Sequence, residues 1–244
     1  MGLTIHYGLT APDGLSTSQA AALVRRLHAS ARRLISGGRI ARVLPISSDP
    51  EDLDRFACAW RILHHPEMPD TTIGHAIPPE AGWLFPIDLG EGSELLWLGL
   101  CRYSQRVTAH GQPRATRLGT RWRFSGFCKT QYASIHGWEH FARCHLAAID
   151  LLAQWRKAGM RVRLNDEGGY WPHRRLATLR ERLDQMNGIV AALGGALKDA
   201  SDDTCGAPIE SPIFSHPHFE RLEAEGLARN VDHIAEAVTS VLKS

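Results

Sequence analysis

The stretch RWRFSGFCKTQYASIHGWEHFARCHLAAIDLLAQWRKAGMRVRLNDEGGYWPHRR, residues 121–175, decides our interpretation of the fold. Residues 121–132 are rich in aromatic side chains and predict a strand, which leads into a loop that carries His136. Residues 139–158 place apolar side chains at spacings of three and four, which predicts a helix. Residues 160–164 predict a second strand, so the unit is strand, helix, strand.

Side chains that can carry out acid–base chemistry gather where this unit changes direction. His136 and His140 lie where the helix begins, and Asp166 and Glu167 follow the second strand. If the two strands run parallel and close together, these groups meet around one cleft at one edge of the sheet. We take these four residues as candidate catalytic groups, with histidine or carboxylate as the base. The candidate ligand-binding residues of the same unit are Lys129, Gln131, Tyr132, Arg121, Arg123, Tyr170 and Trp171.

Other interpretations of these residues stay open at this point. His136, His140 and Cys144 follow one another at intervals of four, a spacing at which helical side chains can share a metal ion, with Asp166 or Glu167 completing the shell. A glycine directly after His136 marks the helix start, which counts against this arrangement. The acidic run with its two glycines is also ordinary turn chemistry. The sequence therefore identifies no metal and no cofactor.

A cysteine nucleophile is a further alternative. Cys128 or Cys144 would attack the substrate, with His136 or His145 as the base. The order of these residues matches no known motif of cysteine hydrolases, so we prefer the interpretation that the thiols are packing residues. The five cysteines are widely spread and include no C-x-x-C pair, which fits a reducing cytoplasm.

The charge distribution is uneven, although the chain carries a formal net charge of only +2. No Asp or Glu occurs between Glu94 and Glu139, while seven basic residues fall in that interval. Such a block with interleaved aromatic residues predicts a surface that binds phosphates or stacks nucleotides. The alternative is a solvated hairpin whose arginines pair with acidic segments such as residues 49–54. The basic residues are Arg102, Arg106, Arg114, Arg117, Arg121, Arg123 and Lys129.

The N-terminal part of the chain predicts a β-α-β start. Residues 3–7 alternate as in a strand, and Ser16 with Gln19 has the form of a capping box that begins a helix. The helical apolar pattern continues to a pair of glycines at 37 and 38, and residues 40–46 predict a second strand.

The middle of the chain mixes helix, loop and strand signals. An aspartate–proline pair predicts the start of a helix over residues 49–63, and several prolines predict an irregular loop over 64–81. Residues 83–87 and 94–103 predict two strands joined by a hairpin. Gly126 interrupts the alternation of the next strand, where we expect a β-bulge.

The C-terminal third predicts helices. Residues 174–200 repeat apolar side chains in steps of three and four from Leu176 to Leu197, which predicts a long helix buried along that stripe. Its glycines disfavour a coiled coil and allow close approach of a neighbouring element. A short helix over 217–225 and a last helix capped by Asn230 are expected to complete the chain.

Together these elements predict an α+β fold with a mixed or mainly antiparallel sheet of about six strands and helices packed on it. The 244 residues show no repeat and no long linker, so we expect a single globular domain over residues 1–244. No apolar run approaches the roughly 20 residues that span a bilayer, and the N-terminus lacks the features of a signal peptide. We therefore expect a cytoplasmic protein without membrane contact, and its low lysine but high arginine and alanine content is typical of a GC-rich bacterial source.

The function that the sequence favours is a cleft for an anionic ligand, either nucleotide-like or a phosphorylated small molecule. If the protein is an enzyme, hydrolysis or phosphoryl chemistry fits best, but the usual nucleotide-binding and hydrolase motifs are missing. The sequence thus leaves open whether the protein is an enzyme. The alternative is a non-catalytic bacterial interaction protein, an immunity or accessory subunit that meets a partner protein through the arginine-rich hairpin. Nucleic acid is a further candidate partner because of the basic block.

Overall fold

A computed structural model describes residues 3–64, 72–109, 111–202 and 210–242 of the protein. Its centre is a six-stranded sheet in which every neighbouring pair is antiparallel. In order across the sheet, the strands are β10 (Arg161–Asp166), β1 (Thr4–Thr10), β9 (Arg123–Lys129), β6 (Leu96–Tyr103), β5 (Pro79–Asp88) and β2 (Arg42–Val43). The predicted α+β fold with about six strands is therefore confirmed.

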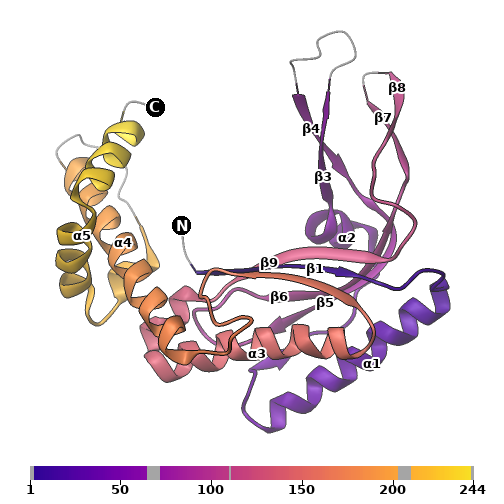
Figure 1. Cartoon of the computed structure of the whole chain (residues 1–244), viewed down its shortest axis with the longest axis horizontal. Coiled ribbons are helices and arrows are strands. Elements are labelled where there is room, and N and C mark those ends of the chain that lie inside the picture. The colour runs from indigo at the N-terminus through magenta and orange to yellow at the C-terminus, as the bar shows by residue number, and fades with distance from the viewer. Residues whose placement is uncertain (1–2, 65–71, 110, 203–209, 243–244) are drawn as a thin grey trace.

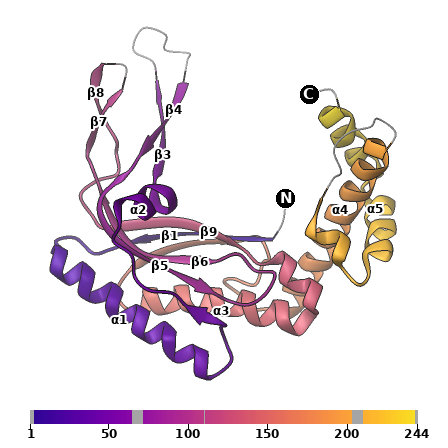
Figure 2. The same ribbon diagram turned by 180° about the vertical axis from the view of Figure 1, so that it is seen from behind.

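Helices α1 (Thr17–Ser36) and α3 (Trp138–Lys157) cover one face of this sheet, as Figures 1 and 2 show. The predicted capping box begins α1, because the Gln19 N–H donates to Ser16 Oγ and the Ser16 N–H donates to Gln19 Oε1. Between the two helices lies Phe85 of β5, whose ring contacts His28 of α1 and Trp155 of α3. The core is therefore centred on the helix-covered face of the sheet, and Leu53 and Ala57 extend it on the opposite face.

Two hairpins extend from one end of the sheet, on the side opposite α1 and α3 (Figure 1). One consists of β3 (Ala59–His64) and β4 (Thr72–Ile77), the other of β7 (Arg106–Ala109) and β8 (Gln112–Ala115). Helix α2 (Pro50–Ala57) lies on the same side of the sheet and contacts β5.

The predictions for this region were wrong in two respects. The helix expected over residues 49–63 ends at Ala57, and part of the loop expected over 64–81 is strand β4. The residues after Ala57 alternate, with Trp60 and Ile62 on one face of β3, and cross-strand pairing with β4 outweighs their helical spacing. Residues 65–71 of the predicted loop lie outside the described residues.

Gly126 does not mark a bulge, which corrects a further prediction. The register between β1 and β9 runs without a shift along the whole of β9. A Cβ atom at Gly126 would lie 2.8 Å from the Tyr7 hydroxyl oxygen, so the glycine leaves space for that ring. The Tyr7 hydroxyl donates a hydrogen bond to the Trp97 carbonyl. The shift in register occurs instead between Pro79 and Ala81 of β5.

At the other end of the sheet, α4 (Leu176–Asp202) and α5 (Phe219–Leu242) form a helical pair (Figures 1 and 2). Of the two short 3₁₀ helices, η1 (Gln131–His136) precedes α3 in the chain and η2 (Pro212–Ser215) lies between α4 and α5. The two C-terminal helices that the sequence predicts are two helical segments of α5 that meet at a kink at Asn230, where φ is −137°, but the first segment continues past residue 226. The strand expected over 121–132 ends earlier, at Lys129, where the chain enters η1.

The stripe predicted on α4 is only partly buried. Leu179 and Leu183 are buried, but Leu176 is 48% exposed, and the stripe's later members are half-buried. The predicted role of the glycines is confirmed, because Gly188 of α4 lies directly against Gly226 of α5. In the part of the chain that the structure describes, no helix has both the length and the apolar character needed to span a membrane.

We predict opposite effects for alanine at the two glycines of this crossing. A Cβ atom at Gly226 would lie 2.0 Å from the Gly188 carbonyl oxygen, so Gly226→Ala must push the helices apart. We expect it to destabilise the α4–α5 pair by about 1–3 kcal/mol. A Cβ atom at Gly188 finds its nearest neighbour at 3.5 Å, so Gly188→Ala should gain about 0.5–1 kcal/mol of helix propensity. Thermal unfolding followed by circular dichroism compares the two, and equal effects would contradict the crossing geometry.

Candidate functional site

The ends of β9 and β10 lie at the same edge of the sheet. Both strands pair antiparallel with β1, one on each side, so they run parallel to each other. Lys129, the last residue of β9, pairs with Thr4, and Asp166, the last residue of β10, pairs with Ile5. The topology thus brings the candidate residues of the two strand ends to one edge.

The adjacent carboxylates at this edge nevertheless point to opposite faces, because side chains alternate along a strand. Asp166 points to the helix-covered face, where its Oδ1 lies 3.1 Å from His145 Nε2 and both side chains are fully buried. Glu167 lies on the other face, where its Oε2 accepts a hydrogen bond from the Thr4 N–H and its Oε1 lies 3.3 Å from His6 Nε2. The two carboxylates therefore face different surroundings.

Asp166 and His145 belong to a buried polar group beneath the sheet. The Thr130 hydroxyl lies 2.9 Å from His145 Nδ1, and the Asp166 carboxylate also accepts hydrogen bonds from the N–H groups of Gly168 and Trp171. Nε2 of His145 has no hydrogen-bond partner of regular geometry among the described residues, and Asp166 Oδ1 is the acidic oxygen that lies 3.1 Å from it. Burial raises the pKa of Asp166, but His145 and the two N–H groups outweigh burial, so the pKa lies below its ordinary value.

Gln131, a candidate ligand-binding residue, is fully buried and holds three elements together. Its Oε1 accepts from the Leu3 N–H at 3.0 Å, and its Nε2 donates to Asn187 Oδ1 at 2.9 Å. Asn187 in turn donates to the Ser134 hydroxyl at 3.1 Å. This network joins the start of β1, η1 and α4, so it fixes the position of α4 relative to the sheet.

His136 and His140 lie together at the start of α3, with ring centroids 5.2 Å apart. Nε2 of His140 lies 2.8 Å from the Glu91 carbonyl oxygen, and its Nδ1 lies 3.1 Å from the Arg143 guanidinium. Because arginine can only donate, Nδ1 accepts and Nε2 carries the hydrogen. Both ring nitrogens of His140 are thus occupied by protein groups. Nε2 of His136 lies 3.8 Å from the Glu91 carboxylate.

The remaining ligand-binding candidates at this edge contact one another or neighbouring cations. The Lys129 ammonium lies 6.0 Å from the centre of the Tyr132 ring. The Arg174 guanidinium lies over both Tyr170 and Trp171, at 5.4 and 5.3 Å. Among the described contacts, therefore, none joins Tyr170 or Trp171 to the two histidines.

The metal and cysteine alternatives gain no support. Within the described ranges, no three His, Cys, Asp or Glu side chains lie close enough together to hold a metal ion. Burial raises the pKa of both the Cys128 and the Cys144 thiol, which disfavours the reactive thiolate. Both thiols donate to backbone carbonyls, Cys128 to Glu94 and Cys144 to Leu89. Cys205 lies outside the described residues.

The seven basic residues of the acid-free interval do not form one surface. Arg106 lies on β7 and Arg114 on β8. Arg102 lies over the Trp122 ring at 5.3 Å, and Arg121 forms an ion pair with Asp13. Arg123 and Lys129, in contrast, lie on the face of the sheet opposite α1 and α3.

The side chains of β10, β1 and β9 that point away from α1 and α3 form one surface, which we call the open face. Figure 1 shows that the three strands lie between the β hairpins at one end of the molecule and α4–α5 at the other. Neighbouring side chains form rows across the strands: Arg161–Thr10–Arg123, Arg163–Gly8–Ser125, Asn165–His6–Phe127 and, at the edge, Thr4–Lys129 beside Glu167. The exposed members are His6, Ser125, Phe127, Arg161, Arg163 and Asn165, and the exposed Glu167 lies beside them at the edge.

The centre of the open face carries two aromatic rings. Phe127 is 59% exposed, and its ring centroid lies 6.2 Å from that of His6, with the planes tilted by 45°. Gly8 follows His6 on the same face of β1, two residues along the chain, and contributes no side chain to the open face. An exposed phenylalanine among polar neighbours contributes little to the core, and the face of its ring is accessible to a ligand.

Positive charge gathers around Arg123 on the same face. Burial lowers the pKa of Arg123, and the neighbouring charges of Arg61, Arg121 and Arg163 lower it further, while Tyr103 acts in the opposite direction. Its Nε is buried and has no hydrogen-bond partner among the described residues. A bound anion would relieve this repulsion and supply the acceptor that Nε lacks.

Sequence reasoning missed most of the open face. It identified Arg123 and Lys129 but not His6, Phe127 or Arg163. A signal was present in residues 123–127, where Phe127 falls in phase with the polar Arg123 and Ser125 and not with the buried Phe124. The Arg-Val-Arg-Leu-Asn pattern of β10 likewise alternates polar and apolar side chains.

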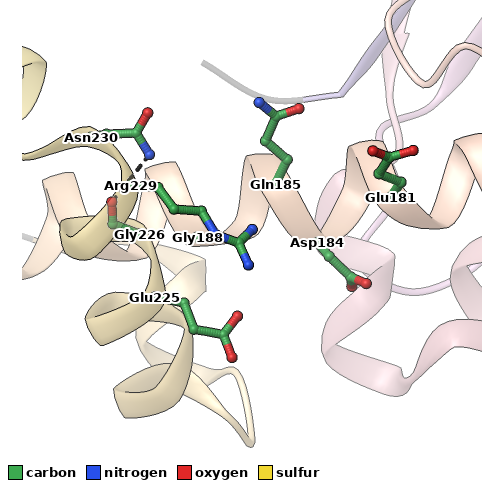
Figure 3. Close-up of a pocket in the computed structure, with 8 residues that line it drawn as sticks. All are labelled: Glu181, Asp184, Gln185, Gly188, Glu225, Gly226, Arg229 and Asn230. Carbon is green, nitrogen blue, oxygen red and sulfur yellow. Dashed lines mark hydrogen bonds between the residues drawn. The ribbon is translucent and has the colours of Figure 1, made fainter.

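Several cavities lie beside the α4–α5 pair. None of the residues that line them is one of the candidate residues named above. One cavity of about 280 Å³ is drawn in Figure 3. Glu181 and Asp184 reach it from α4, and Glu225 and Arg229 reach it from α5, where the Asn230 amide donates to the Gly226 carbonyl. Carboxylates outnumber cations here, so this cavity is a poor site for the anion that the sequence predicts.

No family model matches the sequence, and no curated protein or solved structure shows a significant match to the chain.

We predict a pH-dependent loss of stability from Asp166. Because the folded pKa of Asp166 is lower than the unfolded value, its ionised form stabilises the fold above about pH 4, the unfolded pKa of aspartate. That contribution is lost as the pH falls through the folded pKa. Asp166→Asn should cost about 1.5–3 kcal/mol at neutral pH and flatten the decline below about pH 4. Urea unfolding across this pH range measures both effects. Parallel curves for the two proteins would contradict the assignment.

Proposed function

We propose that the protein binds single-stranded nucleic acid on the open face of β10, β1 and β9. The observation that carries this proposal is the exposed pair Phe127 and His6 next to the arginines 123, 161 and 163. Aromatic rings on a sheet surface stack unpaired bases, and guanidinium groups bind phosphates in a bidentate manner. One surface thus offers partners for both parts of a nucleotide.

The shape of the molecule supports an unpaired strand as the ligand. The rows from Arg161 to Glu167 span about 20 Å along β10, which is enough for two or three stacked bases. The β hairpins and α4–α5 lie at the two ends of the open face (Figure 2). A flat surface with an exposed ring reaches the face of a base only where the base is unpaired, so a duplex should bind more weakly.

This proposal keeps the anionic ligand that the sequence favours and moves it to another surface. Asp166 is buried with His145, and Glu167 is hydrogen-bonded to Thr4, so the two carboxylates offer no shared catalytic site. We therefore propose binding and no hydrolytic step.

Phe127→Ala tests the stacking contribution. If a base stacks on this ring, the variant should bind a short single-stranded oligonucleotide more weakly, with a loss of about 1–3 kcal/mol in binding free energy. Fluorescence anisotropy measures this change, and the thermal midpoint should hardly move because the ring is mostly exposed. Trp60→Ala is a matched control, since Trp60 is 68% exposed on β3 and outside the open face. An unchanged affinity for Phe127→Ala would remove the stacking surface from the proposal.

Charge reversal tests the phosphate contacts. Arg163→Glu changes a residue of the open face. Arg25→Glu makes the same change in net charge on the exposed surface of α1. Each phosphate contact contributes about −0.7 to the slope of log affinity against log salt for a single strand. We expect Arg163→Glu to weaken binding and to reduce the magnitude of this slope by the contribution of about one phosphate contact. Arg25→Glu should leave the slope unchanged. If both variants respond alike, the attraction comes from net charge and not from the open face.

A second candidate function rests on the β3–β4 hairpin. Trp60 and Ile62 lie on one face of β3 and are 68% and 72% exposed. Large apolar side chains at such exposure are typical of contacts with a partner protein. This observation favours the non-catalytic interaction protein that the sequence offers as an alternative. Trp60→Ala distinguishes the two functions, because it should weaken contact with a partner protein and leave nucleic-acid binding intact.

A further inference from the structure

A second cavity near α4 and α5 differs from the one in Figure 3 in its charge. It has a volume of about 220 Å³ and lies where the start of α3 meets α4, η2 and the beginning of α5. The cationic and imidazole side chains that line it are those of Arg180, Arg221, His216 and His218, and Asp184 is its one acidic lining residue. Basic groups therefore dominate this cavity.

The polar groups of the cavity are arranged as donors. The His218 N–H lies 3.1 Å from His216 Nδ1, so Nδ1 accepts and the ring hydrogen is placed on Nε2. Ser134 is only 5% exposed, and its hydroxyl oxygen accepts from Asn187, which leaves its own hydrogen without an acceptor among the described residues. Both groups can donate to an oxyanion.

The start of α3 adds to the positive potential of the same cavity. Gly137 and Trp138 line it, and no side chain caps the first N–H groups of this 20-residue helix. Burial lowers the pKa of His216, and the charges of His218 and Arg221 lower it further. Asp184 acts in the opposite direction but does not compensate for the cations.

We propose that this cavity binds the phosphate group of a phosphate monoester, with Arg180 and Arg221 as its cationic ligands. Leu183, Leu222 and Pro217 provide apolar walls for the organic part of such a ligand. The guanidinium of Arg180 is held over the Trp138 ring at 5.3 Å, which orders it before binding. The monoester is either a small molecule or the 5′-phosphorylated end of a nucleic-acid strand, since both present the same group. This site is separate from the open face and does not depend on the function proposed above.

The test is a titration of the full chain with inorganic phosphate, followed by calorimetry or by amide chemical shifts. Arg180→Gln and Arg221→Gln should each weaken phosphate binding by about tenfold or more, because each removes a charge-assisted contact. Arg229→Gln is the matched control, since Arg229 lies on the same helix as Arg221 but lines only the neighbouring cavities. It should change the affinity less than about twofold.

Further titrations identify the source of the phosphate. Adenosine 5′-monophosphate against adenosine tests a small monoester, and a 5′-phosphorylated oligonucleotide against its 5′-hydroxyl form tests a strand end. Either preference for the phosphorylated form supports the site, provided that Arg221→Gln removes it. Arg163→Glu and Phe127→Ala should leave the part of phosphate binding that Arg221→Gln removes unchanged, so failure of the open-face proposal would not affect this result. Absence of phosphate binding in the millimolar range, or an equal loss in Arg229→Gln, would overturn the proposal.

Discussion

Strand β1 is paired on both sides, and its alternation constrains the rest of the structure. Ile5, Tyr7 and Leu9 point into the core beneath α1 and α3, while His6 and Gly8 point to the opposite face. A slip of one residue would bring the polar side chains into the core, so burial of the apolar set holds the register. The same register decides which side chains of β9 and β10 lie beside His6. The composition of the open face is thus a consequence of how the core packs.

The edge where β9 and β10 end is held by buried polar contacts. Thr130 and Asp166 share His145, and Gln131 joins Leu3 to Asn187 of α4. A buried polar group without a partner costs roughly 1–3 kcal/mol, so most of these groups stabilise the fold by satisfying one another, while His145 Nε2 contacts the Asp166 carboxylate without a regular hydrogen bond. Residues with catalytic potential are used here to fix α3 and α4 against the sheet. This accounts for a titratable cluster, Asp166 included, that is closed to ligands.

Local signals in the sequence predicted most of the regular elements. The capping box of Ser16 and Gln19, the apolar period of α3 and the glycines of α4 depend on neighbours within a few residues. The β3–β4 hairpin was missed because its strands are short and the nearby prolines suggested a loop. Expecting β10 to end at residue 164 placed Asp166 and Glu167 in a loop, where both carboxylates can converge. Because β10 continues to Asp166, alternation separates them. The pairing of Asp166 with His145 depends on tertiary packing, which no local pattern encodes.

The near-neutral net charge of the chain does not weigh against anion binding. At physiological ionic strength, charges more than about 8 Å apart are largely screened in solvent, so a ligand responds to the local arrangement and not to the sum. Around Arg123 the local arrangement is positive, because Arg61, Arg121 and Arg163 all act on it. Asp13 neutralises Arg121 in part, and Glu167 at the edge of the open face is already hydrogen-bonded to Thr4. The register of β1 determines part of this arrangement, since Arg123 lies beside Thr10 and Arg163 beside Gly8 wherever the core is correctly formed. Arg61 comes from β3 of the neighbouring hairpin, so the folding of that hairpin determines the rest.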